Sequence, residues 1–307
     1  MTGTNLAVFD GTEEYPNSAA RRRLASLVGI DDQRERLAKG LRLMFDPDSL
    51  STWSKAHHME NSVIVQYFKE RSPLFVLAGD VGVGKTALAE SIGDAVARES
   101  DIHVTLYRMS LASRGTGLVG EITKLVSGAF AEVGGTAKKT MGTGKHRGAH
   151  ILLIDEADAL AQTRESSQMH HEDRAGVNAL IRGVDEFSSQ RIPAAVLMCT
   201  NRLRAIDPAV RRRAAEILEF PRPGDEQRRM VLAAALKPVG FTSADIEVLV
   251  QKTGSVERSP GFTYSDLTQR ALPAIVLDGY PDKPITFERA VEIVAKTTPT
   301  PQFSEPL

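Results

Sequence analysis

Three glycines, a lysine and a threonine within eight residues form the densest chemical pattern of the chain. The stretch "GDVGVGKT" places Gly79, Gly84, Lys85 and Thr86 at the spacing G-x-x-x-x-G-K-T. Glycines at this spacing let backbone N–H groups converge on one anion, and a helix that starts there adds partial positive charge. A lysine suits the β- and γ-phosphates, and a threonine hydroxyl suits Mg²⁺. We expect nucleotide contacts from Gly79, Val81, Gly82, Val83, Gly84, Lys85, Thr86 and Ala87, with Thr86 also a Mg²⁺ ligand.

An acidic pair follows an apolar run in "ILLIDEAD", residues 151–158. On a buried strand, Asp155 and Glu156 emerge at the carboxyl edge of the sheet, where ligands of open α/β sheets bind. We expect Asp155 to bind the nucleotide's Mg²⁺, directly or through water. Glu156 is then placed to orient and polarise a water for attack on the γ-phosphate. The pattern therefore favours a hydrolase.

Two further polar groups follow apolar strands. Asn201 ends "AAVLMCTN", and its amide could orient the same water, although a Thr-Asn pair at a strand end is more often a turn. Arg211, Arg212 and Arg213 precede the next strand. Neighbours on a helix lie about 100° apart, so one or two of these arginines should face outward, toward a neighbouring subunit's nucleotide. The alternative is a solvated basic helix end.

Strands and helices alternate along the first two thirds of the chain, which predicts an α/β fold with a parallel sheet covered on both faces. From about residue 222 only helical patterns follow, which predicts a small α-helical lid domain. We expect a flexible leader over 1–20, the α/β domain over 21–221, the lid over 222–300 and a tail over 301–307. The strands are expected at 73–78, 103–109, 150–155, 194–200 and 215–220, and the helices between them near 85–98, 118–132 and 173–187.

The bulk composition excludes several classes of protein. The chain has 307 residues, a net charge of −1 and one cysteine, Cys199, so it has no internal disulfide, and a cytoplasmic protein is expected. The sequence contains no run of about 18 consecutive apolar residues, so we expect no membrane span. The segment 134–148 is glycine-rich and basic, and we expect a solvated loop there. Contact with an acidic partner or nucleic acid is the alternative for this segment.

The phosphate loop, "LLIDEAD", "TNR", "IDPAVRRR" and a helical C-terminal segment, in this order, resemble an AAA+ ATPase of the AAA branch. The resemblance covers about residues 26–295. It implies Mg-ATP, a homohexameric ring and a protein substrate. It also implies that Asn201 is the first sensor, that Arg212 and Arg213 are arginine fingers acting on the next subunit, and that Val28 and Gly29 lie against the adenine.

Three longer stretches are similar to the pachytene-checkpoint-type ATPases, which unfold part of HORMA-domain proteins. They are "MSLASRGTGLVGEITKLVSGAF", "RAGVNALIRGVDEF" and "GFTYSDLTQRALPAIV". Bacterial relatives of this type belong to antiphage systems with a cyclic-oligonucleotide synthase (CD-NTase). The resemblance implies a HORMA-domain partner. A DNA-linked loader or initiator, another protein unfoldase, or a nucleotide-gated scaffold with little turnover are the alternatives.

The chain departs from this family in two places. The segment expected to line the pore, 113–121, has no aromatic residue, which leaves Arg114, Leu118 and Val119 as candidate contacts with the substrate. The start of the "GFTYSDL" helix lacks the lid arginine of the family, and Arg270 lies further along. We expect a second pore loop at Met169, His170 and His171, where an exposed polar turn is the alternative.

Overall fold

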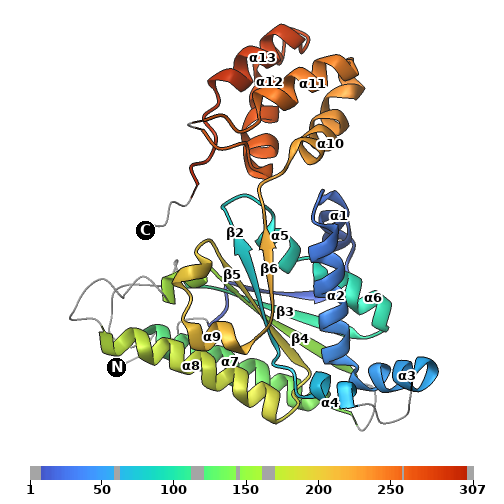
Figure 1. Ribbon diagram of the computed structural model, residues 1–307, viewed down its shortest axis with the longest axis vertical. Helices are drawn as coiled ribbons and strands as arrows, with labels where there is room; N and C mark the ends of the chain where they lie inside the picture. The colour runs from blue at the N-terminus through green and yellow to red at the C-terminus, as the bar shows by residue number, and fades with distance from the viewer. Residues whose placement is uncertain are drawn as a thin grey trace. The chain divides into compact units, whose positions relative to one another are not determined.

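The computed structural model describes residues 8–58, 63–111, 121–142, 146–160, 170–257 and 259–302 (Figure 1). The chain divides into two compact units. The first comprises Met1–Ala25, Asp32–Ala78 and Thr86–Glu219, and the second comprises Ser26–Asp31, Gly79–Lys85 and the chain from Phe220. The phosphate loop therefore clusters with the C-terminal helices, although it follows a strand of the first unit's sheet.

The first unit is built on a six-stranded sheet with the order β1-β3-β4-β5-β2-β6. β3 and β4, β4 and β5, and β5 and β2 pair in parallel, which brings the carboxyl ends of these four strands to one edge. The five expected strands are present within two residues of their predicted limits. The strands are β1 (Gly11–Tyr15), β2 (Leu74–Gly79), β3 (His103–Ser110), β4 (Gly148–Asp155), β5 (Ala194–Thr200) and β6 (Ala214–Phe220).

Helices cover both faces of this sheet. In Figure 1, α7 and α8 lie on one face, and α2 and α6 lie on the other. The central strands β2, β4 and β5 are buried on both faces, which explains their continuous apolar runs. The helices before the last strand are α1 (Ser18–Ser26), α2 (Asp31–Phe45), α3 (Pro47–His57), α4 (Val63–Lys69), α5 (Lys85–Ala89), α6 (Ile92–Ser100), α7 (Glu121–Thr140), α8 (His170–Ser189) and α9 (Pro208–Arg213).

Small residues let these helices approach their neighbours closely. A Cβ added to Gly183 of α8 would lie 2.2 Å from Cγ of Phe130, which belongs to α7. A Cβ on Gly40 of α2 would lie 2.6 Å from the Phe75 ring on β2. Both aromatic rings are buried in the core. Glycines therefore let α8 pack closely on α7, and α2 pack closely on β2.

Three expectations about local structure were wrong. The leader is not loose throughout, because Gly11–Tyr15 pairs antiparallel with β3 and α1 follows at once. The sheet is therefore not wholly parallel. The basic segment 134–148 is not simply a loop, because its first part, 134–140, completes α7, where Gly134 faces the Phe187 ring. The helix expected over 85–98 is two helices, separated at residues 90 and 91.

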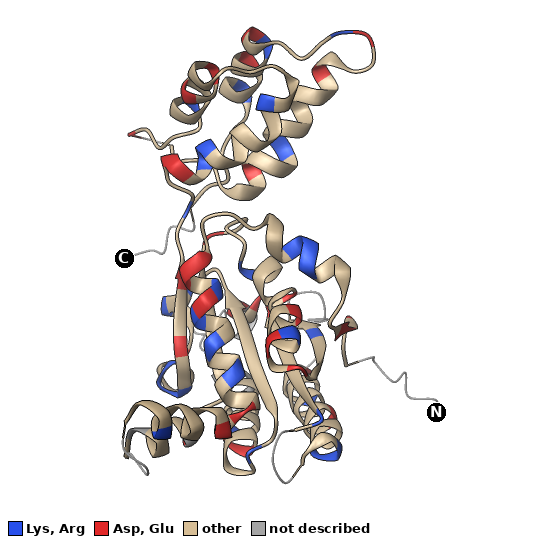
Figure 2. Cartoon of the chain, turned by 90° about the vertical axis from the view of Figure 1, so that its right-hand side faces the viewer, with Lys and Arg blue, Asp and Glu red and all other residues tan. Residues whose placement is uncertain are grey.

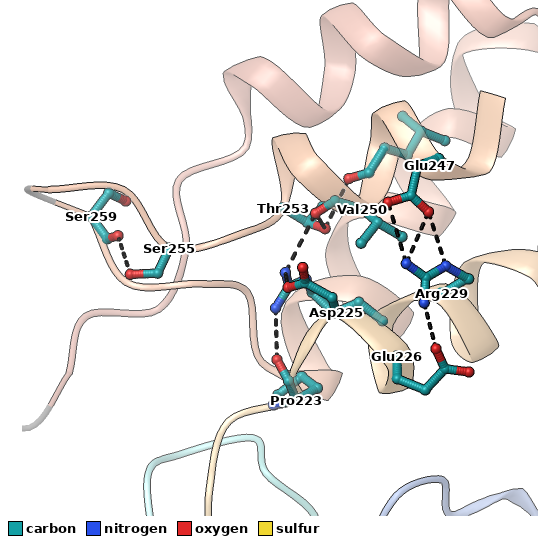
Figure 3. Close-up of polar contacts among 11 residues, drawn as sticks. Pro223, Asp225, Glu226, Arg229, Glu247, Val250, Thr253, Ser255 and Ser259 are labelled. Atoms are coloured by element: carbon teal, nitrogen blue, oxygen red, sulfur yellow. Dashed lines mark hydrogen bonds and ion pairs between the residues drawn. The ribbon is translucent and has the colours of Figure 1, made fainter. Parts of the chain in front are cut away.

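The second unit contains a helical bundle with its own core, which includes Leu232, Leu249, Leu267 and Ile275. Arg229 on α10 bonds through Nε and Nη2 to both carboxylate oxygens of Glu247 on α11, at 2.9 and 3.2 Å (Figure 3). The bundle helices are α10 (Asp225–Leu236), α11 (Ser243–Lys252), a π-helical turn (Asp266–Ala271), α12 (Leu272–Gly279) and α13 (Phe287–Lys296).

Acidic and basic residues are interspersed along both units (Figure 2), and the net charge is −1. Within the described ranges, no helix combines the length and the apolar character that crossing a bilayer requires.

Candidate nucleotide-binding and hydrolysis site

The phosphate loop holds its lysine by its own backbone. The Lys85 side chain is buried, and Nζ donates hydrogen bonds to the carbonyl oxygens of Gly79 and Asp80, both at 2.7 Å. Gly82 and Gly84 have φ angles of 77° and 100°, in the left-handed region that favours glycine. The glycines are thus needed for the turn, and the ammonium group is kept over the loop where phosphate oxygens could replace the two carbonyl acceptors.

Val28 and Gly29, the residues expected at the adenine, lie between α1 and α2 within the second unit. Gly29 has a φ of 70°, and a Cβ there would lie 2.3 Å from Cγ of Gln227 and 2.6 Å from the hydroxyl of Tyr264. Burial, reinforced by the nearby carboxylate of Asp31, raises the pKa of Tyr264 to about 12, so its hydroxyl stays protonated. Sequence reasoning missed Gln227 and Tyr264, because only the fold brings them to Gly29.

The acidic edge of the sheet holds Glu156 in an unusual conformation. Glu156 directly follows β4 and has a φ of 53°, uncommon for a residue with a side chain. Its carboxylate accepts a 2.6 Å hydrogen bond from Ser110 Oγ at the end of β3, and its backbone N–H donates to Asp155 Oδ1 at 2.9 Å. Outliers of this kind concentrate at functional sites. The two carboxylates are therefore aimed by the backbone and by the register of β3 with β4.

A third carboxylate, Asp158, connects the turn after β4 to the end of β5. It is buried, and its Oδ1 accepts hydrogen bonds from Thr200 Oγ1 at 3.1 Å and from the backbone N–H of Asn201 at 3.2 Å. The candidate sensor Asn201 is therefore positioned by the last residue of the "IDEAD" stretch. Sequence reasoning stopped at Glu156, although this aspartate was part of the quoted motif.

The three consecutive arginines have different surroundings on α9. Arg213 forms a bidentate ion pair with Asp185 of α8, with bonds of 2.8 and 3.1 Å. Arg212 is exposed, whereas Arg211 is half-buried. The expectation that these side chains cannot all face one way agrees with this arrangement. Arg212 is the one that projects into solvent, and Arg213 would have to leave Asp185 to reach another molecule.

Several candidates lie outside the described residues. Arg114, Leu118, Val119 and Met169 belong to this group, and the side chains of His170 and His171 do as well. Arg270 is described, and its Nη1 donates to Asp266 Oδ1 at 3.0 Å. The expected pore loops therefore stay predictions.

The donor set fits Mg²⁺ delivered with a nucleotide. Mg²⁺ at phosphoryl-transfer sites is typically held by one or two protein oxygens, phosphate oxygens and water. Thr86 in α5 and Asp155 at the end of β4 would supply a hydroxyl and a carboxylate. Among the described residues, no group of three or more histidine, cysteine or acidic side chains could hold a metal by itself.

A largely parallel sheet with an acidic pair after β4, a phosphate loop after β2 and a C-terminal helical bundle are together typical of a P-loop ATPase. The family model "ATPase family associated with various cellular activities (AAA)" matches residues 75–222. "CD-NTase-associated protein 6" of Escherichia coli strain MS 115-1 is 54% identical over 298 residues, 96% of this chain and 96% of that protein. The chain belongs to the AAA family of ATPases.

Two solved structures are similar over nearly their full length. A chain of the complex of HORMA, CdnC and Trip13 from E. coli MS115-1 is 54% identical, with a TM-score of 0.90, over 96% of this chain and 97% of that chain. The structure of Rhizobiales Trip13 is 46% identical, with a TM-score of 0.74, over 95% of this chain and 99% of that one.

Proposed function

We propose that this chain uses Mg-ATP hydrolysis to remodel a HORMA-domain protein within a cytoplasmic bacterial antiphage system built around a CD-NTase. The single observation behind this proposal is the similarity, over nearly the whole chain, to a protein solved together with a HORMA protein and CdnC. A likeness this extensive includes the lid and the segments between motifs, so it reaches beyond the ATPase core.

In this proposal the phosphate loop binds the β- and γ-phosphates of ATP, and Lys85 exchanges its two carbonyl acceptors for phosphate oxygens. Thr86 and Asp155 hold Mg²⁺, which would stabilise charge on the transferred phosphoryl group. Glu156 orients and polarises the attacking water, and Asn201 senses the γ-phosphate. The hydrogen bond from Ser110 and the left-handed backbone support the role of Glu156, because both fix its carboxylate.

The active form is a homohexamer in which an arginine reaches the neighbouring subunit's ATP. The exposure of Arg212 supports its role as that finger, since an arginine acting on another molecule must project outward. Leu118 and Val119, with Arg114, would contact the substrate in the central pore.

A trapping experiment tests the proposal. Glu156→Gln keeps the shape of the side chain but removes the base, so it should bind ATP, hydrolyse it on the order of 100-fold more slowly, and retain the partner. Tagged Glu156→Gln chain is mixed with a purified HORMA-domain protein and ATP, and retention is compared with ADP. Single-turnover release of γ-phosphate checks that the chemical step is lost.

The matched control is the Lys85→Ala, Glu156→Gln double variant, which should release the HORMA-domain protein in ATP. A Glu156→Gln chain that binds ATP but does not retain the HORMA-domain protein would contradict the proposed partner. Salt-sensitive retention of duplex DNA instead would favour the loader or initiator class.

A further inference from the structure

Arg222 joins three distant segments of the second unit. It lies between β6 and α10, and its side chain is only 10% exposed. Nε donates to Asp80 Oδ2 at 2.7 Å, Nη1 to the carbonyl of Gly261 at 2.7 Å, and Nη2 to the carbonyl of Thr300 at 2.8 Å. The planar guanidinium fork permits three such bonds at once, which lysine could not reproduce. One side chain therefore connects the phosphate loop to the C-terminal segment.

Asp80 puts a negative charge inside a loop that must accept a polyanion. It is the second residue of the loop, and its carboxylate pairs with Arg222 while its carbonyl accepts from Lys85. An unpaired carboxylate there would repel phosphate and would be partly desolvated. The arginine therefore has two effects, since it neutralises Asp80 and also fixes the first turn of the loop.

A second contact holds the tip of the same loop. The N–H of Ser265 donates to the carbonyl of Gly82 at 3.1 Å, and a Cβ on Gly82 would lie 2.6 Å from Cβ of Ser265. Any side chain at Gly82 would push the loop away from the segment that contains Ser265. The loop and this segment are thus fitted to each other at van der Waals distance.

Asp266 orders the segment that receives the loop tip. Its carboxylate is fully buried and accepts bonds from Thr263 N–H at 2.9 Å, Thr300 N–H at 3.0 Å and Thr300 Oγ1 at 2.7 Å. Burial alone would raise the pKa of Asp266, but hydrogen bonds from Thr263 and Thr300 bring it below its usual value. Arg270 adds its own bond to the same carboxylate. Thr300 therefore contacts both Asp266 and Arg222.

We propose that Arg222 is a positioning residue for ATP, which neutralises Asp80 and holds the phosphate loop in its binding shape, and that Thr300 completes this support from the C-terminal segment. The proposal rests on the proposed ATP binding by this loop. Arg222 would act through Asp80 and the loop, so its effect should appear in ATP affinity. The rate of hydrolysis at saturating ATP should change little, because the groups assigned to the chemical step lie elsewhere.

A double-mutant cycle on Arg222 and Asp80 separates this role from a merely structural one. Arg222→Gln should weaken ATP binding about tenfold, because it removes the charge-assisted bond from Arg222 to the Asp80 carboxylate. Asp80→Asn removes the repulsive charge, so the double variant should bind ATP within about threefold of Asp80→Asn alone. The matched control is Arg229→Gln, since Arg229 pairs with Glu247 inside the bundle and should leave affinity unchanged.

Titration calorimetry with ATP on the full chain measures each affinity, and circular dichroism checks folding. Should Arg222→Gln fail to fold, Arg222→Lys takes its place, with weakened binding expected because a single ammonium nitrogen cannot reach all three acceptors that Nε, Nη1 and Nη2 of Arg222 contact. The proposal would be overturned if the folded Arg222 variant bound ATP with wild-type affinity. It would also be overturned if the double variant bound ATP no more tightly than Arg222→Gln. If the unaltered chain does not bind ATP, or if Lys85→Ala binds ATP as tightly as the unaltered chain, the nucleotide site itself would be refuted.

Discussion

In the phosphate loop, the ammonium of Lys85 is bonded to two carbonyls of the loop itself, whereas at the sheet edge the carboxylate of Glu156 is bonded to a hydroxyl from the next strand. In the proposed function, Lys85 exchanges its present bonds for phosphate oxygens. Glu156 is already fixed by Ser110 and by its own backbone. The contrast suggests that the loop adapts to the nucleotide, while the sheet edge is positioned in advance for the chemical step.

This contrast makes a general prediction about kinetics. Changes in the loop should raise the dissociation constant of ATP, because they remove contacts with the bound nucleotide. Changes at the sheet edge and on α9 should lower kcat, because they affect groups used only as the phosphoryl group leaves.

The largest effect is expected for the exposed arginine of α9. Arg212→Ala should lower kcat on the order of 1,000-fold with little change in ATP affinity, because arginine fingers act on the transition state. Arg213→Ala should have a far smaller effect, since it breaks a surface ion pair with Asp185. Steady-state ATPase assays compare the two variants.

Mixed rings test whether Arg212 acts between subunits. Arg212→Ala chains mixed with Lys85→Ala chains form some interfaces with an intact loop beside an intact arginine, so activity should partly return. No recovery despite demonstrated subunit exchange would place Arg212 in its own subunit's site or in a structural role.

The loop itself gives the next largest effect. Lys85→Ala should weaken ATP binding about 100-fold or more, because charge-assisted contacts to two phosphate groups are lost. Calorimetric titration provides the measurement, and Lys237→Ala, at an exposed lysine, is the control. Equal affinities for Lys85→Ala and the unaltered chain would remove the loop from the site.

A smaller change is expected at the support of Glu156. Ser110→Ala removes one hydrogen bond to the carboxylate and should lower kcat about tenfold, with ATP affinity unchanged. Ser189→Ala, at a serine whose hydroxyl bonds within α8, is the matched control. A Ser110→Ala chain that loses affinity instead of rate would erase the distinction between the two regions.

The smallest effect concerns stability and not catalysis. Burial lowers the pKa of His150 on β4 to about 4, and its Nδ1 lacks a partner in the described structure. The unfolded chain takes up a proton near pH 6.5 that the folded chain refuses, so stability falls as pH drops from 6.5 toward 4. Between pH 7.5 and 6 the loss from this residue is about 0.8 kcal/mol, less than the ~1.4 kcal/mol of a tenfold change in rate. Denaturant unfolding should show that the free energy of unfolding depends less steeply on pH in His150→Phe than in the unaltered chain. The same pH dependence in both chains would show that His150 does not cause it.

The sequence predicted the sheet strands and the phosphate loop well because their signals are local. Apolar runs mark buried strands, and the glycine spacing marks the turn. It missed β1, because "GTEEY" has no local strand signal and becomes a strand only through its hydrogen bonds to β3. Tyr15 at its end packs against Gly93, a contact that no sequence pattern announces.

The same reason explains what was missed at the candidate site. Glu156 and Asp158 follow the end of β4, and they bond to Ser110 at the end of β3 and to Thr200 at the end of β5, so these contacts depend on sheet register. Gln227 and Tyr264 approach Gly29 from some 200 residues away in the chain, as the spacing of the printed sequence shows. The end of α7 was missed because Gly134, Gly135 and Thr136 have low helix propensity, while burial of Val133 and Ala137 stabilises the helix there.

The antiparallel strand β1 also has a consequence for solubility. It covers the side of β3 that would otherwise present unpaired N–H and C=O groups along His103–Ser110, a ready template for adding a strand from another molecule. β1 itself is short and has Glu13 and Glu14 near its middle, and charges of this kind discourage strand addition. A chain shortened to begin after Pro16 would keep every residue proposed for ATP binding and hydrolysis. It would also expose an apolar strand edge, and it should aggregate at concentrations where the longer chain stays dispersed.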